Sequence, residues 1–347
     1  MLKILPMEDR VTNVLIFIIL ILFMIALIHD IGIVQYFRIP RSSLQNFSTI
    51  FISILLEAIP FIMLGAFISS IIQVLVSEDM IARWIPKNIF IGLILASLMG
   101  LIFPVCECAI VPIVKRLIKK GVPVSIAVTF MLAAPIINPI VLLSTYYAFY
   151  NKPSVVLIRA GYGLICAIMA GIMIGIVFKN ENVILTEDIE LNNECYCGCG
   201  SRYNHQKNKN KLVIILNQAN TELYNIGKYL IVGAFLSATF QTVVPRNFLT
   251  SFGENQILSV VVMIILAFFI SICSSADAFI AKSFLGQFAI GSLVAFLIMG
   301  PMIDLKNTLM LSGTFKKGFV VRLIIYIFFL CLIVGTSINI LAMLGGI

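Results

Sequence analysis

The sequence predicts an all-α polytopic membrane protein with two homologous halves, broken or re-entrant membrane helices and an extra N-terminal helix. Three observations predict this class. Hydrophobic residues make up 61% of the 347 residues and charged residues only 12%, about half the charged fraction of a soluble domain. Apolar runs of membrane-helix length recur along the chain. Two of these runs are interrupted by small and polar residues at matching places, about 167 positions apart.

The apolar runs are long enough to cross a bilayer, which takes roughly 18 residues or more. They cover 11–29, 48–76, 90–118, 123–150, 154–178, 212–244, 256–285, 289–312 and 318–344. The first run is too long for a signal-peptide core and lacks a small-residue cleavage site, so we expect an uncleaved helix.

An internal repeat divides the chain. Cys106 and Lys115 return as Cys273 and Lys282, and Gly65-Ala66-Phe67 returns as Gly233-Ala234-Phe235. We therefore expect a first permease-like repeat over residues 45–178 and a second over 212–347. Residues 1–44 form the extra N-terminal helix and its loop, and residues 179–211 form a polar linker.

The distribution of Lys and Arg favours one topology. If 90–118 and 256–285 are re-entrant hairpins, the halves are inverted, and the N-terminus and the 179–211 linker are cytoplasmic. The alternative, in which both segments cross fully and the halves are parallel, separates the basic residues less well. A continuous helix over 90–118 would be about 43 Å long, against a core of roughly 30 Å. We expect a multi-pass protein of the cell membrane.

The first interruption carries Pro104, Cys106, Glu107 and Cys108. Proline removes a backbone donor, so Pro104 and the later Pro112 are expected to open the helix. In an extended stretch Cys106 and Cys108 point the same way and offer two soft ligands to a thiophilic solute. A carboxylate at membrane depth, here Glu107, typically marks an ion or proton path. The alternative is that the cysteines fill space and Glu107 pairs with Lys115 or Arg116 near the interface.

The second interruption is richer in oxygen. It keeps one sulfur at Cys273 and adds Ser274, Ser275 and Asp277. Together the two interruptions predict an asymmetric substrate site, softer on one side and harder on the other. The alternative for Asp277 is a structural ion pair with Lys282.

Two further polar residues lie inside apolar runs beside prolines. Asn138 lies between two prolines, and Asp304 occupies the matching place in the second repeat, with Lys306 near enough to neutralise it. Each of these two residues predicts a break in its apolar run and a contact with solute. The alternative is that both side chains cap broken half-helices.

The polar linker holds three closely spaced thiols, Cys195, Cys197 and Cys199, with His205 six residues later. Thiolates and imidazole are Zn²⁺ ligands, so a metal site is one interpretation. The spacing is not that of a zinc finger, and a nonessential linker is the other interpretation.

Three motifs carry a family resemblance: Phe103-Pro104-Val105-Cys106-Glu107-Cys108, then Gly121-Val122-Pro123, then Ala134-Pro135-Ile136-Ile137-Asn138-Pro139. From about residue 45 onward the chain resembles the bacterial predicted-permease family that includes the ArsP-like organoarsenical efflux permeases. The resemblance implies a permease of the cytoplasmic membrane. For the ArsP-like members it implies export of trivalent organoarsenicals.

These observations favour a secondary transporter, with Glu107, Asp277 or Asp304 as a candidate carrier of a coupling proton. No nucleotide-binding motif, cofactor motif or basic soluble domain is found, so we predict no cofactor and no nucleic-acid partner. Two other classes stay open: an intramembrane thiol-dependent oxidoreductase using Cys106 and Cys108, and a membrane anchor subunit of a larger complex.

Overall fold

The computed structural model describes residues 41–75, 88–103, 105–178, 181–185, 211–243 and 256–344. Pro104, the predicted helix over 11–29 and the linker residues Cys195, Cys197 and Cys199 lie outside the described residues. Across the described ranges the regular elements are helices, and the extended backbone forms only isolated bridges. The all-α class is therefore confirmed.

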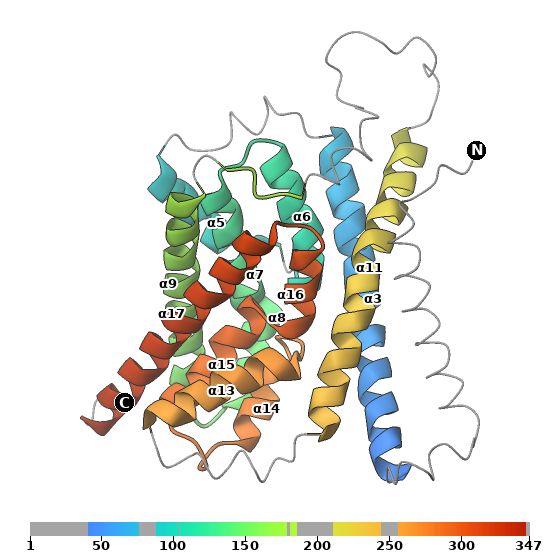
Figure 1. Ribbon diagram of the computed structural model, residues 1–347. Helices are drawn as coiled ribbons and strands as arrows, with labels where there is room; N and C mark the ends of the chain where they lie inside the picture. Colours follow the sequence, from blue (N-terminus) through green and yellow to red (C-terminus); the bar gives the residue numbers. More distant parts are fainter. Residues whose placement is uncertain are drawn as a thin grey trace, which may run out of the picture.

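The helices follow the predicted apolar runs (Figure 1). They are α3 (Arg41–Leu75), α5 (Ile89–Ile102), α6 (Glu107–Lys119), α7 (Val124–Ile137), α8 (Pro139–Ala148), α9 (Ser154–Val177), α11 (Lys211–Val243), α13 (Gln256–Ile270), α14 (Asp277–Ser283), α15 (Ile290–Met302), α16 (Leu305–Ser312) and α17 (Lys317–Met343). In the described ranges 4 spans are long and apolar enough to cross a membrane, or up to 5 when α7 and α8 count as one bent span. The chain is therefore a multi-pass membrane protein.

Four of the predicted runs are broken into helix pairs: α5–α6, α7–α8, α13–α14 and α15–α16. The break between α7 and α8 falls at Asn138 with a bend of 40°. The prediction that Pro112 opens the helix is wrong, because Pro112 lies inside α6. Its carbonyl oxygen accepts a hydrogen bond from Ser69 of α3 at 3.2 Å, so the neighbouring helix supports this turn.

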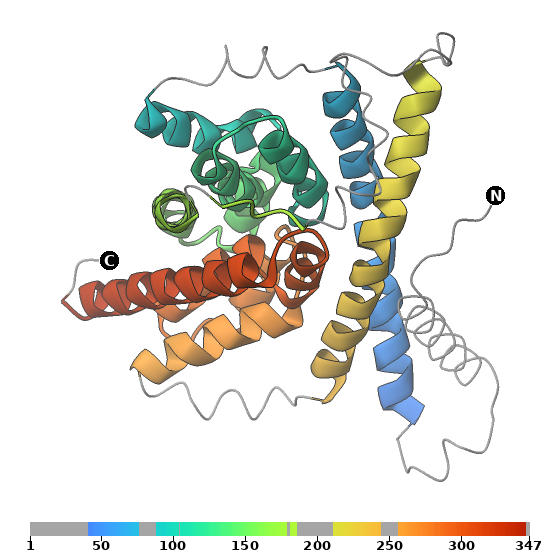
Figure 2. The ribbon, with the colours of Figure 1, turned by 45° about the horizontal axis from the view of Figure 1, so that its top comes forward.

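The helices α3 and α11 lie along each other at one side of the molecule, and we call them the α3–α11 pair (Figure 2). Phe47 and Phe51 of α3 meet Phe235 of α11 edge to face, which fixes the pair at one end. The remaining helices form a bundle around α7 and α15, whose residues are almost all buried. The protein thus has two parts that face each other.

Two glycines bring the α3–α11 pair close to the bundle. A Cβ atom on Gly65 of α3 would lie 2.5 Å from the carbonyl oxygen of Ala109 in α6, and one on Gly233 of α11 would lie 2.7 Å from the Cα atom of Lys306 in α16. Small residues allow such close backbone contact between membrane helices. The glycines therefore set the distance between the pair and two helices that carry charged residues.

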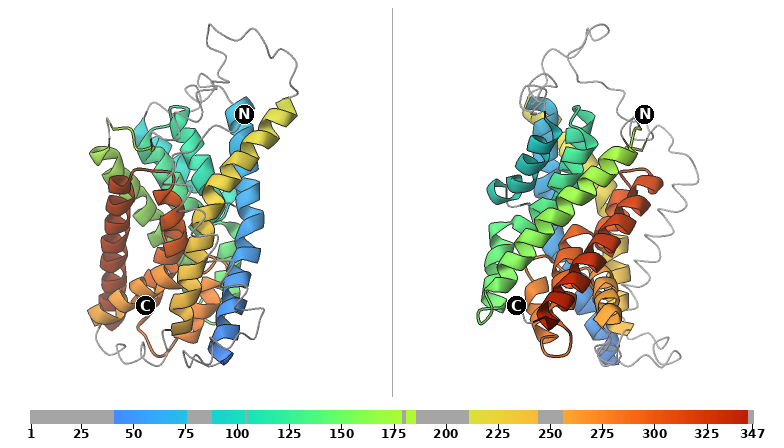
Figure 3. Two further views of the ribbon diagram at one scale, coloured as in Figure 1. Left: turned by 45° about the vertical axis from the view of Figure 1, so that its right-hand side comes forward. Right: turned by 90° about the vertical axis from the view of Figure 1, so that its left-hand side faces the viewer.

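The short helices α6 and α14, each of which follows a break, lie toward opposite ends of the molecule (Figure 1). In the left-hand view of Figure 3, α3 and α11 lie at the side of the molecule opposite α17, and residues of both breaks line a cavity together with residues of α3 and α11. The breaks are thus brought to the boundary between the two parts.

Candidate functional site

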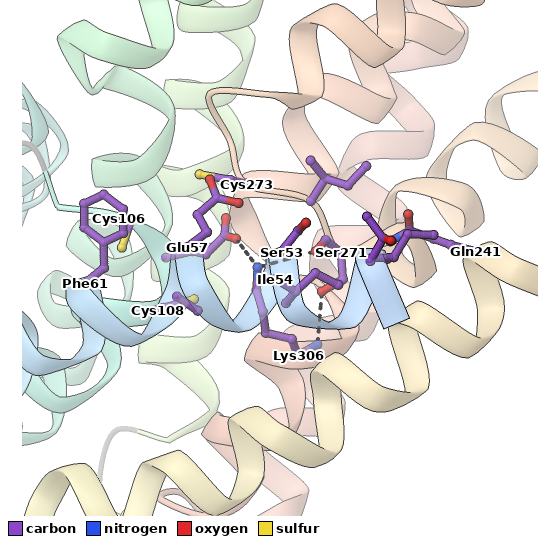
Figure 4. Close-up of a pocket in the computed structure, with 15 residues that line it drawn as sticks. Ser53, Ile54, Glu57, Phe61, Cys106, Cys108, Gln241, Ser271, Cys273 and Lys306 are labelled. Carbon is purple, nitrogen blue, oxygen red and sulfur yellow. Dashed lines mark hydrogen bonds and ion pairs between the residues drawn. The ribbon is translucent and has the colours of Figure 1, made fainter. Parts of the chain in front are cut away.

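A cavity of about 230 Å³ lies where the two predicted interruptions meet the α3–α11 pair (Figure 4). The interruptions contribute residues that are far apart in sequence. The polar and sulfur-containing residues that line it are Thr49, Ser53, Glu57, Cys106, Glu107, Cys108, Gln241, Ser271, Cys273 and Lys306. The cavity therefore collects residues from α3, α11, α16 and both breaks.

The first break presents its thiols through a short extended stretch. Cys106 is the last extended residue, with φ −80° and ψ 167°, and α6 begins directly after it at Glu107. Cys106 is half-buried, and Cys108 is buried in the first turn of α6. Both thiols line the cavity, although Cys108 lies in a helix and not in the extended backbone that the sequence suggested.

Glu107 forms a buried ion pair with Lys306, 199 positions away. The Nζ atom of Lys306 lies 2.9 Å from Oε1 of Glu107 and 3.3 Å from Oδ2 of Asp304. Glu107 is only 2% exposed, and in the part of the chain that the structure describes its Oε2 atom has no hydrogen-bond partner. The alternative that Glu107 pairs with Lys115 or Arg116 near the interface is therefore wrong.

Ser271 fixes the start of the second break. Its φ is 52°, a left-handed conformation that costs a non-glycine residue about 1–3 kcal/mol. Its hydroxyl donates to Oδ2 of Asp304 at 2.6 Å and accepts from the backbone N–H of Lys306 at 3.3 Å. The same residue thus ends α13, ties the break to α16 and lines the cavity, although the sequence analysis gave it no role.

Cys273 is the residue of the second break that faces the cavity with a thiol. It is half-buried, and its Sγ atom lies 3.4 Å from the hydroxyl of Ser275. Figure 4 shows the side chain of Glu57 near it. Ser274 is buried, and neither it nor Ser275 is among the described residues that line the cavity.

Asp277 forms a bidentate ion pair with Arg159 of α9. The two guanidinium nitrogens lie 3.0 and 2.7 Å from its two carboxylate oxygens. Arg159 also donates to the hydroxyl of Thr145 at 2.7 Å and to the carbonyl of Ser274 at 3.3 Å, and it is 0% exposed. The alternative pairing with Lys282 is therefore wrong. An arginine inside the apolar run 154–178 was the signal that would have suggested this cluster.

Asn138 and Asp304 both cap a half-helix. The side-chain oxygen of Asn138 accepts from the N–H of Ile140 at 3.0 Å, and Oδ1 of Asp304 accepts from the N–H of Asn307 at 2.6 Å. Capping satisfies backbone donors that a broken helix leaves unpaired. Neither residue is among the described residues that line the cavity, and Asp304 contacts two that do, Ser271 and Lys306.

Further polar contacts join the α3–α11 pair to the bundle. Gln241 and Ser237 of α11 donate to the carbonyls of Ile270 and Phe269, at 2.7 and 3.2 Å, where α13 ends. Nearer the other end of α11, the carboxylate of Glu222 accepts from Ser69 at 2.7 Å and lies 3.7 Å from Arg116. Hydrogen bonds near one end of α11 and a buried charged cluster near the other thus join the α3–α11 pair to the bundle.

The chain matches the profile of one protein family, and two relatives align with it over more than four fifths of its length. The profile of a family described as a predicted permease matches residues 43–340. The UPF0718 protein YcgR of Bacillus subtilis is 48% identical over 287 residues, which cover 83% of this chain and 95% of that protein. A Streptococcus mutans protein named as a subunit of a two-component membrane permease complex is 41% identical over 302 residues, covering 86% of this chain and 97% of that protein. No solved structure matches the chain.

Proposed function

Because the chain belongs to the predicted-permease family that includes the ArsP-like members, we propose that it is a secondary transporter whose solute site is the cavity between the two breaks. One observation carries this proposal. Cys106, Glu107, Cys273 and Lys306 come from distant parts of the chain and line one cavity within a membrane-helical fold. Broken helices that meet at a cavity are how many transporters build a binding site.

The proposed transport cycle uses two homologous halves, residues 45–178 and 212–347, in inverted orientation. Each half has a long first helix, two broken helix pairs and a long last helix, which supports the repeat. The opposite placement of α6 and α14 supports re-entrant hairpins that enter from opposite sides. The N-terminus and the linker are then cytoplasmic, and movement of the α3–α11 pair against the bundle exposes the cavity to each side in turn.

The proposed solute is small and thiophilic. Cys106 and Cys273 bring one thiol from each break to the cavity, with Cys108 behind the first. Trivalent organoarsenicals are the solute class that the family resemblance implies, and export is the direction it implies. A transporter agrees with the family description better than a thiol oxidoreductase does.

A coupling proton, if the protein uses one, is best carried by Glu107. Of the three candidate carboxylates, Glu107 alone is among the described residues that line the cavity. Asp277 has both oxygens bound to Arg159, and Asp304 has both occupied by Ser271 and Asn307. Neutral variants at Glu107 should therefore remove the pH response of transport, whereas an unchanged response in Glu107→Gln would rule out this role.

Accumulation of methylarsenite in everted membrane vesicles tests the proposal. Vesicles that contain the protein should accumulate more than vesicles without it, and Cys106→Ser should abolish the difference. A Cys166→Ala variant, which removes a buried thiol in α9 away from the cavity, should leave it unchanged. Absence of uptake of this and other thiophilic solutes, with the protein confirmed in the membrane, would contradict the proposed site.

A second candidate function rests on the Streptococcus relative, which is named as one subunit of a two-component complex. By this candidate the chain is the membrane subunit of such a complex and transports only with its partner. Proteoliposomes that contain this chain alone separate the two: solute uptake without any other protein would exclude an obligate complex.

A further inference from the structure

The cavity is lined by both sulfur and carboxylate groups. Cys106 and Cys273 offer sulfur, and Glu57 and Glu107 offer carboxylate oxygen. Oε2 of Glu107 is buried and has no hydrogen-bond partner among the described residues, although its other oxygen binds Lys306. A buried carboxylate oxygen without a donor is costly, so this atom points to a ligand that the cavity is built to receive.

The formal charges around the cavity do not balance. Glu57 and Glu107 line it, and Asp304 lies directly behind Lys306. Lys306 is the positive residue in this described lining, so three carboxylates face one ammonium. Arg159 does not offset them, because it is committed to Asp277. The cluster therefore has a formal excess of two negative charges, which a divalent cation would neutralise.

We infer that the cavity binds a borderline-soft divalent cation of the Zn²⁺ and Cd²⁺ class as its transported solute, and that the ammonium of Lys306 neutralises Glu107 when the cavity is empty. This rests on the proposed function, since it names the solute of the same site. Cysteine sulfur and carboxylate oxygen together suit such ions. Ca²⁺ and Mg²⁺ instead prefer sites made of oxygen alone.

The site has to close around its ion. Among the described residues no three Cys, His, Asp or Glu side chains stand close enough to hold a metal ion together. Cys106 and Glu107 belong to the first break, Cys273 to the second and Glu57 to α3. An ion that draws these groups together therefore brings the two breaks and the α3–α11 pair toward each other, which is the movement that a transport cycle requires.

Lys306 competes with the ion for Glu107. Its ammonium lies 2.9 Å from Oε1, so a cation at Glu107 must overcome repulsion from this neighbour or displace it. Removing the charge with Lys306→Met should strengthen cation binding by at least tenfold, which corresponds to about 1.4 kcal/mol. The same change should slow release, so transport should fall even though binding becomes tighter.

Cadmium binding to the full-length protein in detergent tests the inference, with the ultraviolet charge-transfer band of cadmium–thiolate bonds as the readout. All variants carry serine at Cys195, Cys197 and Cys199, so that thiols of the linker do not contribute. The background protein should show the band, and Zn²⁺ but not Mg²⁺ should compete. The band should weaken in Cys106→Ala and disappear in Cys106→Ala with Cys273→Ala. It should form with at least tenfold lower affinity in Glu107→Gln, whereas Cys166→Ala should retain it.

Failure of this inference differs from failure of the proposed function. Methylarsenite uptake without cadmium binding would overturn the cation inference and leave the permease site in place. A cadmium band that survives the removal of both Cys106 and Cys273, or equal competition by Mg²⁺, would also overturn it. If Lys306→Met does not fold, the thiol and Glu107 variants still decide the question, because each is compared with Cys166→Ala.

Discussion

Glu107 and Asp277 each lie at the start of the short helix that follows a break, and they have different surroundings. Each is the first residue of its helix, where the helix dipole favours a carboxylate. Asp277 is enclosed, with both oxygens bound to Arg159. Glu107 shares Lys306 with Asp304 and keeps one oxygen unpartnered at the cavity. The partner supplied by a distant helix, and not the place at the start of a short helix, decides which carboxylate is available to a solute.

The ion pair of Arg159 stabilises the fold, whereas that of Lys306 lies at the candidate site. Arg159 holds α14 and the carbonyl of Ser274 against α8 and α9, so it fixes the backbone that presents Cys273. Lys306 instead joins the first break to α16 at the edge of the cavity. We therefore expect changes at the Asp277 cluster to affect stability and changes at the Glu107 cluster to affect transport.

The largest expected effect is the loss of Arg159. The variant Arg159→Met leaves a buried carboxylate unpaired, which should lower the free energy of unfolding by about 3–5 kcal/mol. Thermal unfolding of the purified protein in detergent measures this. The exposed Arg322, which stacks on the Phe178 ring, is the matched control, and Arg322→Met should change stability little. The double variant Arg159→Met with Asp277→Leu should recover most of the loss. Equal unfolding temperatures for Arg159→Met and wild type would contradict the structural role.

A smaller loss of stability is expected from Glu107→Gln. It removes one charge-assisted hydrogen bond, worth about 1.5–3 kcal/mol, and Lys306 keeps Asp304 as a partner. Transport should nevertheless fall at least tenfold, because the carboxylate at the cavity is lost. Asp277→Asn should lose more stability than Glu107→Gln and less of its transport activity. If transport by both variants falls only as far as the amount of folded protein falls, Glu107 has no role in transport that Asp277 lacks.

Gly233→Ala should cost about 1–3 kcal/mol, because the added methyl group meets the backbone of Lys306. It should also alter solute uptake, since it pushes α11 away from the helix that carries Lys306. Gly227→Ala on the same helix is the control, because a Cβ atom there has nothing within 4 Å. Thermal unfolding and vesicle uptake of both variants would check this, and equal behaviour of the two would contradict the close approach of α11 and α16.

The smallest effect is expected from Ser275→Cys, which gives the second break two thiols like the first. Ser275 is half-buried and does not belong to the described cavity lining, so the free energy of unfolding should change by less than about 0.5 kcal/mol. Solute uptake should stay within about twofold of wild type, a change of about 0.4 kcal/mol. A large gain or loss of uptake would mean that the residues of the break, and not their surroundings, set its role.

The helices and their breaks were predictable because the signals are local. A proline or a polar residue inside an apolar run, as at Asn138 and Asp304, marks a break without knowledge of the fold. Pro112 shows the limit of this rule, since a single proline can stay inside a helix that its neighbours support. The boundaries of the two proposed halves stay a prediction.

The ion pairs were not predictable because their partners lie far apart. Lys306 and Glu107 are separated by 199 positions, and Arg159 and Asp277 by 118. The nearest opposite charge in sequence, Lys282 for Asp277, was the wrong partner. Lys306 for Asp304 was found correctly, because Asp304 caps α16 and Lys306 lies in its first turn. The assignment of Cys106, Glu107 and Cys273 to a solute site stays a prediction, supported by their common cavity.

The central claim is that one thiol from each break faces the transported solute. The most direct test compares two double variants for accumulation of methylarsenite and of radioactive cadmium in everted vesicles. Cys106→Ala with Cys273→Ala removes the two half-buried thiols of the cavity, and Cys166→Ala with Cys331→Ala removes two buried thiols of α9 and α17. The first pair should abolish uptake of the solute that wild type accumulates, and the second pair should leave it unchanged. Full uptake by the first pair, with normal amounts of protein in the membrane, would contradict it.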